Sequence, residues 1–418
     1  MRQMDSGRRV TLEALASLLM PAEPGRHGVL VETDERWRLE RSALPRGTDV
    51  FLWGAAAISP ARPSAVLLSA VRREAQLLKL RRHAPTPFRI RGIHRLPPPR
   101  LRGSSVRSEL RAALQQGVLV EMTARTGELR VVDAAANAAG AKETVAGLRL
   151  GSGGTALALI EDSGGDSVLL RAGGSMGALP VVHAAAALEH LAASEVGPVP
   201  HLMASGEICG ASWSTESLLK GHRPKQLTPR VIAEAIAFCL RLPRRHEATS
   251  VGTAIDIIAE QVPQDASALA GIKAYLHEAC ASLPGVMTHG DMWAGNLLVD
   301  RGGLSGVVDW DAWHPAGIPG TDVMYLMVAE LWLRKKRPLG QIWIERPWRS
   351  IHFKSVTAEY WAGFELEPGT DLLDAVGIAS WAAQVSGNLM RSPQLADNTR
   401  WVGNNVRIPL GSFGKPDR

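Results

Sequence analysis

The sequence predicts an α+β fold in which a small antiparallel sheet precedes a larger, mostly helical region. Two observations lead to this prediction. Between residues 129 and 216, short apolar runs alternate with glycine-rich turns, which is typical of consecutive strands. Beyond Pro229, apolar residues recur at helical spacing over much longer segments. The first third of the chain shows both patterns, and we expect it to contain both helices and strands, as in an α/β region.

The predicted elements can be given in chain order. We expect helices at 12–20, 64–82, 104–116, 180–193, 230–242, 252–261, 266–283, 321–333, 351–361 and 372–389. We expect strands at 28–32, 36–39, 49–53, 118–123, 129–132, 145–150, 155–161, 167–171, 201–204 and 211–216. An extended region is expected between residues 284 and 311.

Length and composition limit the class of protein. A chain of 418 residues is too long for one compact core, so we expect two or three domains. Its 45% hydrophobic and 21% charged residues exclude a disordered chain. No apolar stretch reaches the ~18 residues of a membrane helix. The three cysteines share no metal-ligand spacing and are too few for a disulfide scaffold, so we expect a soluble cytoplasmic protein.

The positive charge is concentrated in one region. The net charge is +6, and residues 51–130 hold 15 Arg and Lys against 4 Asp and Glu. Such a region can attract a polyanion, but no aromatic residues interleave with it and no nucleic-acid motif accompanies it. We therefore interpret it as a solvated surface and do not expect nucleic acid as a partner.

The most informative segment lies between Thr288 and Asp311. Residues 297–300 and 304–309 are apolar strand candidates, joined by Gly302-Gly303. A two-residue glycine loop favours a tight hairpin. With that loop, Asn296 falls opposite Asp309 on the same face of the hairpin, and Asp291 lies five residues before Asn296.

These three side chains suit magnesium-dependent phosphoryl transfer. Magnesium takes one or two oxygen ligands from protein and the others from water and phosphate, and Asn296 and Asp309 can supply such oxygens. Asp291 is placed to orient an acceptor hydroxyl and to accept its proton. The alternative is that Asp, Asn and Gly are here turn formers only.

The segment resembles the aminoglycoside phosphotransferase and choline kinase family. The family's His-Gly-Asp-x-x-x-x-Asn loop stands here as His289-Gly290-Asp291 through Asn296, and its metal-binding aspartate as Asp309 in Asp309-Trp310-Asp311. The family's Gly-x-Pro-x-x-Asp stretch matches residues 317–322. The resemblance implies that Asp291 is the catalytic base, that Asn296 and Asp309 bind Mg²⁺, and that His289 and Asp322 brace the loop.

The resemblance also implies an architecture and a reaction. It implies a bilobal protein-kinase-like fold, with an N-lobe over residues 131–216 that binds nucleotide. A helical C-lobe over 217–418 holds the catalytic loop and the acceptor site. Residues 1–130 would form an additional N-terminal α/β extension. The implied reaction moves the γ-phosphate of ATP or GTP, with Mg²⁺, to a hydroxyl of a small molecule such as an aminoglycoside, sugar or amino alcohol.

The nucleotide side departs from the family pattern. Arg171 stands on the strand where the family has a phosphate-binding lysine, and Glu189 on the next helix is its expected partner. Arginine also binds phosphate, but the two side chains are not interchangeable. Gly153 and Gly154 lie where a phosphate-covering loop belongs, although a plain hairpin turn explains them equally well.

Three alternatives therefore stay open. The chain is a phosphotransferase, a catalytically silent kinase fold that binds nucleotide or acts as a scaffold, or a nucleotidyl transferase, which the arginine at 171 makes conceivable. Trp293, Trp310 and Trp313 near the motif are either core residues or a platform for a ligand. The sequence does not identify the acceptor or the oligomeric state.

Overall fold

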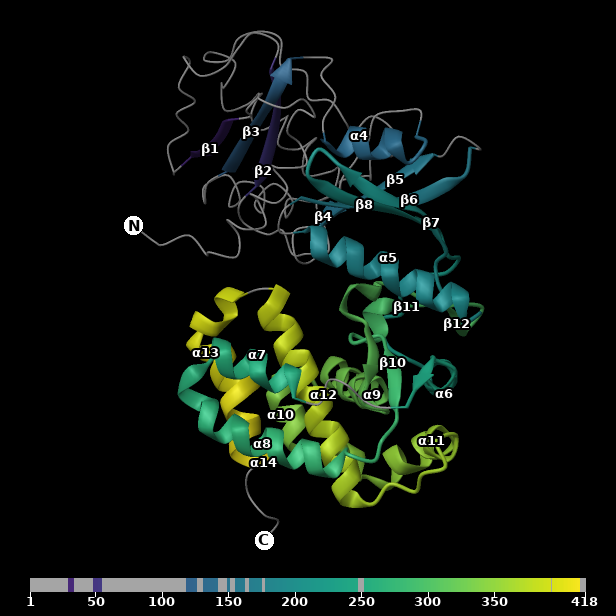
Figure 1. Cartoon of the computed structure of the whole chain (residues 1–418), viewed down its shortest axis with the longest axis vertical. Helices are drawn as coiled ribbons and strands as arrows, with labels where there is room; N and C mark the ends of the chain where they lie inside the picture. Colours follow the sequence, from purple (N-terminus) through teal and green to yellow (C-terminus); the bar gives the residue numbers. More distant parts are fainter. Residues whose placement is uncertain are drawn as a thin grey trace, which may run out of the picture. The chain divides into compact units, whose positions relative to one another are not determined.

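The computed structural model describes residues 29–33, 48–54, 118–125, 131–141, 149–150, 155–161, 165–174, 177–246, 252–391 and 393–413. By its internal contacts the chain divides into two compact units, one of residues 1–182 and 202–218 and the other of residues 183–201 and 219–418. Figure 1 labels most of the elements of both units.

The first unit begins with a three-stranded antiparallel sheet. Its strands are β1 (Val29–Thr33), β2 (Thr48–Gly54) and β3 (Val118–Arg125), in the order β1-β3-β2. All three were predicted from the sequence. The predicted strand 36–39 and the predicted helices 12–20, 64–82 and 104–116 lie outside the described residues.

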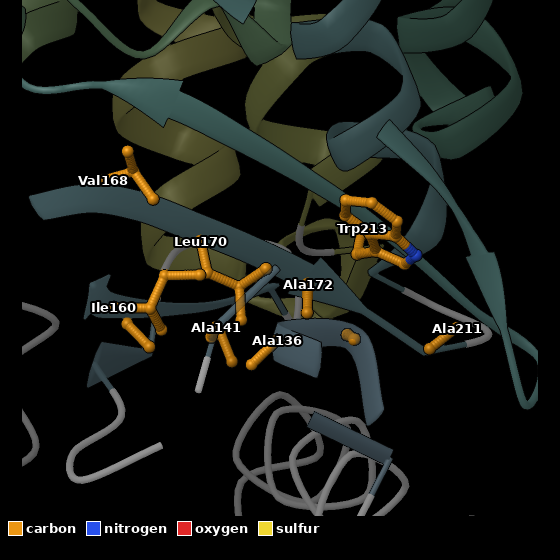
Figure 2. Close-up of a cluster of buried hydrophobic side chains, with 11 residues drawn as sticks. Ala136, Ala141, Ile160, Val168, Leu170, Ala172, Ala211 and Trp213 are labelled. Atoms are coloured by element: carbon orange, nitrogen blue, oxygen red, sulfur yellow. The ribbon is translucent and has the colours of Figure 1, made fainter. Parts of the chain in front are cut away.

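A five-stranded antiparallel sheet forms the other part of this unit. Its order is β4-β5-β6-β8-β7, formed by β4 (Arg149–Leu150), β5 (Thr155–Glu161), β6 (Ser167–Gly173), β7 (Leu202–Ile208) and β8 (Ala211–Ser217). Side chains alternate between the two faces of each strand. On one face the apolar side chains of β5, β6 and β8, Leu170 and Trp213 among them, pack against alanines of α4 (Val131–Ala138), as Figure 2 shows. Arg171 therefore lies on the opposite face.

The sequence prediction is wrong at the start of this unit. Residues 129–132 were expected to form a strand, but Val131 begins the helix α4. The alanines at 134–136 explain the difference, because alanine has the highest helix propensity and these small side chains fit closely against the sheet. The strand expected at 145–150 is described only at Arg149–Leu150.

The second unit is mostly helical. Its helices include the later part of α5 (Ala178–Ala193), whose first residues belong to the first unit. The others are α6 (Pro229–Leu240), α7 (Thr253–Gln261), α8 (Ala266–Ala279), α9 (Thr321–Lys335), α10 (Leu339–Ile344), α11 (Ile351–Ala362), α12 (Thr370–Arg391), α13 (Thr399–Val402) and α14 (Ile408–Phe413). The long helix α12 is central, since it contacts α7, α8 and α9 (Figure 1). The short helices α10, α13 and α14 were not predicted.

Two small antiparallel sheets carry the chemical motif. One has the order β13-β10-β9, from β9 (Arg244–Arg245), β10 (Gly285–Thr288) and β13 (His314–Gly317). The other is the hairpin of β11 (Leu297–Asp300) and β12 (Gly303–Val307). The extended region expected between 284 and 311 is therefore present.

The register of this hairpin differs from the prediction by two residues next to the turn and by one residue at Leu297. The loop is Arg301-Gly302, both with positive φ (48° and 79°), and Asp300 pairs with Gly303. Gly303 belongs to β12, where the absence of a side chain leaves room for Glu234, whose carboxylate accepts the Leu304 N–H at 2.5 Å. A bulge between Leu298 and Val299 then brings the ladder one residue back toward the predicted register, so that Leu297 pairs with Val307. Asn296 therefore lies opposite Val308 and not opposite Asp309.

The α+β fold class predicted from the sequence is confirmed, with a small antiparallel sheet before a mostly helical unit. In the part of the chain that the structure describes, no helix combines the length and apolarity that crossing a membrane would require. Of the three cysteines, Cys209 is exposed, whereas Cys239 and Cys280 are buried.

Candidate functional site: a braced catalytic loop

Asp322 holds the backbone of the loop that follows β10. This carboxylate is buried in the first turn of α9. It accepts the N–H of His289 at 2.6 Å and the N–H of Gly290 at 2.9 Å. Burial raises the pKa of Asp322, while His289 and the two N–H groups partly oppose the rise. Since the carboxylate is paired on both oxygens, the loop is fixed to the start of α9.

His289 joins the loop to the end of the hairpin. The ring is fully buried and packs against Trp310, with 4.5 Å between the ring centroids. Its Nδ1 accepts the backbone N–H of Asp291 at 3.2 Å, so the proton must be on Nε2, which lies 3.0 Å from the Val308 carbonyl oxygen. The side chain therefore links the backbone at Asp291 to the residue before Asp309.

Gly290 allows this close approach. Its φ is +77°, and a Cβ at this position would overlap the carbonyl oxygen of Ala312. The Gly290 carbonyl in turn accepts the side-chain amide of Gln384 on α12 at 2.6 Å. The loop is thus held from two sides, by α9 and by α12. Gln384 was not identified from the sequence.

Asn296 is bonded directly to Asp291. Its Nδ2 donates to the Asp291 carboxylate oxygen Oδ2 at 3.0 Å and to the Asp291 carbonyl at 2.9 Å. Asn296 is buried and Asp291 is half-buried. Both of these bonds are donated by Nδ2, so neither of them uses the amide oxygen Oδ1 of Asn296. The structure thus brings together two of the three side chains that the sequence singled out.

Asp309 follows the residue that pairs with Asn296. The Val308 N–H donates to the Asn296 carbonyl at 2.9 Å, and Asp309 then takes a left-handed conformation with φ of 73°. The register error therefore separates the two predicted ligands by one residue and does not remove Asp309 from the neighbourhood of Asn296.

The donor set fits a hard divalent cation. Among the described residues, no group of three or more His, Cys, Asp and Glu side chains is arranged to hold a metal ion. Magnesium does not need such a group, because it usually takes one or two carboxylate ligands and completes its shell with water and phosphate. The free amide oxygen of Asn296 and the carboxylate of Asp309 match this requirement.

Tyr325 is a neighbour of Asp291 that the sequence analysis missed. It lies on α9 one turn after Asp322, close enough to Asp291 for the charge of that carboxylate to act on the Tyr325 hydroxyl. Burial and the negative charge of Asp291 both raise the pKa of Tyr325. The helical spacing from Asp322 was a signal for this placement, since residues three apart share a helix face.

The residues predicted to bind the nucleotide are divided between the two units, with Arg171 in the first and Glu189 in the second. Arg171, on β6 of the first unit, is buried and its Nε donates to Glu216 of β8 at 2.9 Å. The expected partner Glu189 is exposed on α5. Gly153 and Gly154 lie outside the described residues. Sequence reasoning missed Glu216 because cross-strand neighbours depend on register.

The three tryptophans near the motif have different surroundings. Trp310 is a buried core residue between Phe238 and His289. Trp293 packs against Trp332 of α9, with 6.3 Å between centroids. Trp313 packs against the ring of His190. The core interpretation holds for Trp310.

Comparison with known proteins gives a family match. Residues 158–343 match the model of the phosphotransferase enzyme family. No curated protein sequence matches the chain.

Solved structures give weaker likenesses. The chain is similar to a thermostable mutant of aminoglycoside phosphotransferase APH(4)-Ia in a ternary complex with AMP-PNP and hygromycin B, with 14% identity over 68% of this chain and 99% of that chain and a TM-score of 0.47. It is also similar to APH(3'')-Id from Streptomyces rimosus in complex with ADP and streptomycin, with 13% identity over 56% and 93% of the two chains and a TM-score of 0.40.

The matched segment contains the whole braced loop, from the last strands of the sheet through Asp291, Asn296 and Asp309 to the end of α9. The resemblance inferred from the His-Gly-Asp motif is therefore confirmed by the match of residues 158–343 to the model of the phosphotransferase enzyme family.

Proposed function

We propose that this chain transfers the γ-phosphate of ATP or GTP to a hydroxyl group of a small molecule. Asp291 acts as the base, His289 braces it, and Asn296 and Asp309 hold Mg²⁺. The single observation that carries the proposal is the bond from Asn296 Nδ2 to Asp291 Oδ2. It places a carboxylate base beside an amide whose remaining oxygen is available to a cation.

The base has the environment that the reaction needs. Asp291 is half-buried, so an acceptor hydroxyl can reach it, while its backbone N–H is held by His289. Phosphoryl transfer asks the protein mainly for positioning and charge neutralisation. Asp291 orients the acceptor hydroxyl by accepting its hydrogen bond, and it takes the proton as the hydroxyl attacks phosphorus.

The metal ligands are one amide and one carboxylate. Asn296 keeps its nitrogen on Asp291 and offers Oδ1, and Asp309 offers its carboxylate. When bound, magnesium supplies charge neutralisation for the phosphate oxygens of the nucleotide. A site made by two side chains relies on the nucleotide for further ligands, so we expect the cation and the nucleotide to bind together.

On the nucleotide side we propose that Arg171 contacts phosphate in place of lysine, with Glu189 and the loop of Gly153 and Gly154 as further contributors. The bond between Arg171 and Glu216 supports a fixed guanidinium, because a buried ion pair holds a defined geometry. For the acceptor, the family suggests an aminoglycoside, a sugar or an amino alcohol.

The test is transfer of labelled γ-phosphate from ATP and GTP to a panel of hydroxyl acceptors, with and without Mg²⁺. Asp291→Asn removes the base with little change of shape, and we expect activity to fall about 10²–10⁴-fold. Asp300→Asn is the matched control, because Asp300 is an exposed aspartate on the hairpin that follows the loop. Equal activity of the wild type and Asp291→Asn would refute the proposal.

The same samples separate the alternatives. Nucleotide binding without transfer to any acceptor, unchanged in Asp291→Asn, would indicate a silent kinase fold. Mass analysis of a modified acceptor distinguishes a phosphoryl group from a nucleotidyl group.

A further inference from the structure

Arg171 is held by a residue of its own sheet. Its Nε donates to Oε1 of Glu216 at 2.9 Å, and both side chains of this ion pair are buried. Arg171 lies on β6 and Glu216 on β8, which are neighbouring strands of the five-stranded sheet. The two partners are therefore joined by the backbone hydrogen bonds of one ladder as well as by their side chains.

The register of this ladder explains why the pair forms. Arg171 pairs with Ser214, and Leu169 pairs with Glu216. Side chains two residues apart in a strand lie on the same face, so all four share the face of the sheet opposite to α4. Glu216 is thus the diagonal neighbour of Arg171, at a distance of about 7–8 Å that two long side chains can span.

One bond at Nε orients the whole guanidinium group of Arg171. The group is planar and carries five N–H donors in a rigid fork, so fixing Nε sets the directions of both terminal nitrogens. A buried charge without a partner is strongly unfavourable, which keeps Arg171 on the Glu216 carboxylate. Arg171 therefore has a defined orientation, and a fixed donor is what the positioning of a phosphate group needs.

The acid that holds Arg171 is not the one expected from the sequence. Glu189 was the expected partner, but it is exposed on α5 and belongs to the second unit. Arg171 and Glu216 both belong to the first unit. A pair with Glu189 would depend on the placement of a helix, whereas the pair with Glu216 depends only on the pairing of β6 with β8.

We propose that Glu216 is a positioning residue for the nucleotide, which directs the guanidinium of Arg171 toward the phosphate groups. This inference rests on the proposed function, because it takes Arg171 as the residue that contacts phosphate. Glu216 does not bind the nucleotide itself, since a carboxylate repels phosphate; it acts through Arg171.

The contact is tested by NMR without any activity. In full-length protein labelled with ¹⁵N-arginine, the Nε–H resonance of Arg171 is assigned with Arg171→Lys. Glu216→Gln should move this resonance, and Glu161→Gln, which changes an exposed glutamate at the end of β5, should leave it in place. Addition of Mg²⁺ and a non-hydrolysable ATP or GTP analogue should also move it. An Arg171 resonance that stays in place while the analogue binds would overturn the proposal.

The role is tested by comparing a ligand that has phosphates with one that has none. Glu216→Leu should weaken binding of the nucleoside triphosphate roughly ten- to a hundred-fold, the effect of losing a hydrogen bond to a charged group. Binding of the nucleoside should stay within about two-fold of wild type, because it lacks the phosphates that Arg171 contacts. Glu216→Gln keeps an acceptor oxygen and should recover most of the affinity. Equal losses for both ligands would indicate a structural role only and overturn the proposal.

A double variant keeps the test valid if Glu216→Leu does not fold. Replacing both partners of a buried ion pair by apolar residues is often neutral or stabilising, so Arg171→Met combined with Glu216→Leu should fold. Because Glu216 acts through Arg171, the double variant should bind the triphosphate as weakly as Arg171→Met alone. A further loss of affinity in the double variant would overturn the proposal.

Two more variants serve as controls. Ser214 is buried opposite Arg171, and its Oγ makes no hydrogen bond within the part of the chain that the structure describes, so Ser214→Ala should leave triphosphate binding unchanged. Glu189→Leu should weaken triphosphate binding less than Glu216→Leu. The reverse order of these two glutamate variants would overturn the proposal.

Failure of the proposed function gives a different result. If triphosphate binding depends on Glu216 as predicted but no acceptor is phosphorylated, the transfer reaction is refuted and the role of Glu216 in binding stands. If the wild type transfers phosphate and Glu216→Leu binds the triphosphate as the wild type does, only the present inference is refuted. A wild type that binds no nucleotide refutes both.

Discussion

Removing the buried carboxylate of Asp322 should destabilise the second unit by an amount that the structure lets us work out. Asp322 accepts two backbone N–H groups, from His289 and Gly290. A buried donor left without an acceptor costs about 1–3 kcal/mol. Asp322→Ala leaves two such donors, which predicts a loss of about 2–6 kcal/mol. Asp322→Asn retains one acceptor oxygen, which predicts about half of that loss.

The pH dependence of this effect has a defined sign. The folded-state pKa of Asp322 is raised, because burial disfavours its charge. A group with a raised folded pKa contributes its full stability below the unfolded value of about 3.8, and this contribution is lost as the pH rises through the folded pKa. The stability advantage of the wild type over Asp322→Asn should therefore be largest at the acidic end and should shrink as the pH rises.

Urea unfolding followed by tryptophan fluorescence is a suitable assay, because Trp310 packs against the His289 ring of the braced loop. The expected order of stability is wild type, then Asp322→Asn, then Asp322→Ala. Either an Asp322→Ala protein as stable as the wild type, or a stability advantage over Asp322→Asn that grows with pH, would refute the reasoning.

Three further predictions concern single residues. Gly290→Ala should abolish transfer and lower the melting temperature, because a Cβ would meet the Ala312 carbonyl, whereas Gly271→Ala on α8, where a Cβ meets nothing, should be neutral or slightly stabilising. The Leu304 N–H lowers the pKa of Glu234, so the contribution of the Glu234 carboxylate to stability is present above about pH 4.5 and is lost as the pH falls. In Glu234→Gln, the melting temperature should therefore depend less on pH in this acidic range than it does in the wild type. A thiol reagent at pH 8 should modify one cysteine per folded chain and three after denaturation. The reason is that burial raises the pKa of Cys280 to about 11 and that of Cys239 well above its usual value. Two cysteines that react rapidly in the folded protein would contradict this prediction.

Much of the fold followed from local sequence patterns. The strands of the five-stranded sheet and the long helices of the second unit are where alternation and helical spacing predicted them. The start of α4 was wrong, because two valines favour a strand while the following alanines favour a helix, and packing against the sheet decides between them.

The site was predictable only in part, for a physical reason. His289, Asp291 and Asn296 are close in sequence, so a short loop brings them together and the motif reveals them. The hairpin register was wrong, because the choice of Arg301-Gly302 as the turn depends on Glu234 binding Leu304 from another element. Contacts of this kind need the tertiary structure.

The side of α9 that faces the loop has a consequence for substitutions elsewhere. Asp322 contacts the loop at His289 and Gly290, and Trp332 contacts it at Trp293, from one side of α9. A helix turns by about 100° per residue, so a small rotation of α9 about its axis would break these contacts together. Changes of side-chain size in the core behind α9, at Val323 or Val328 for example, can therefore disturb the loop although neither residue touches it in these bonds.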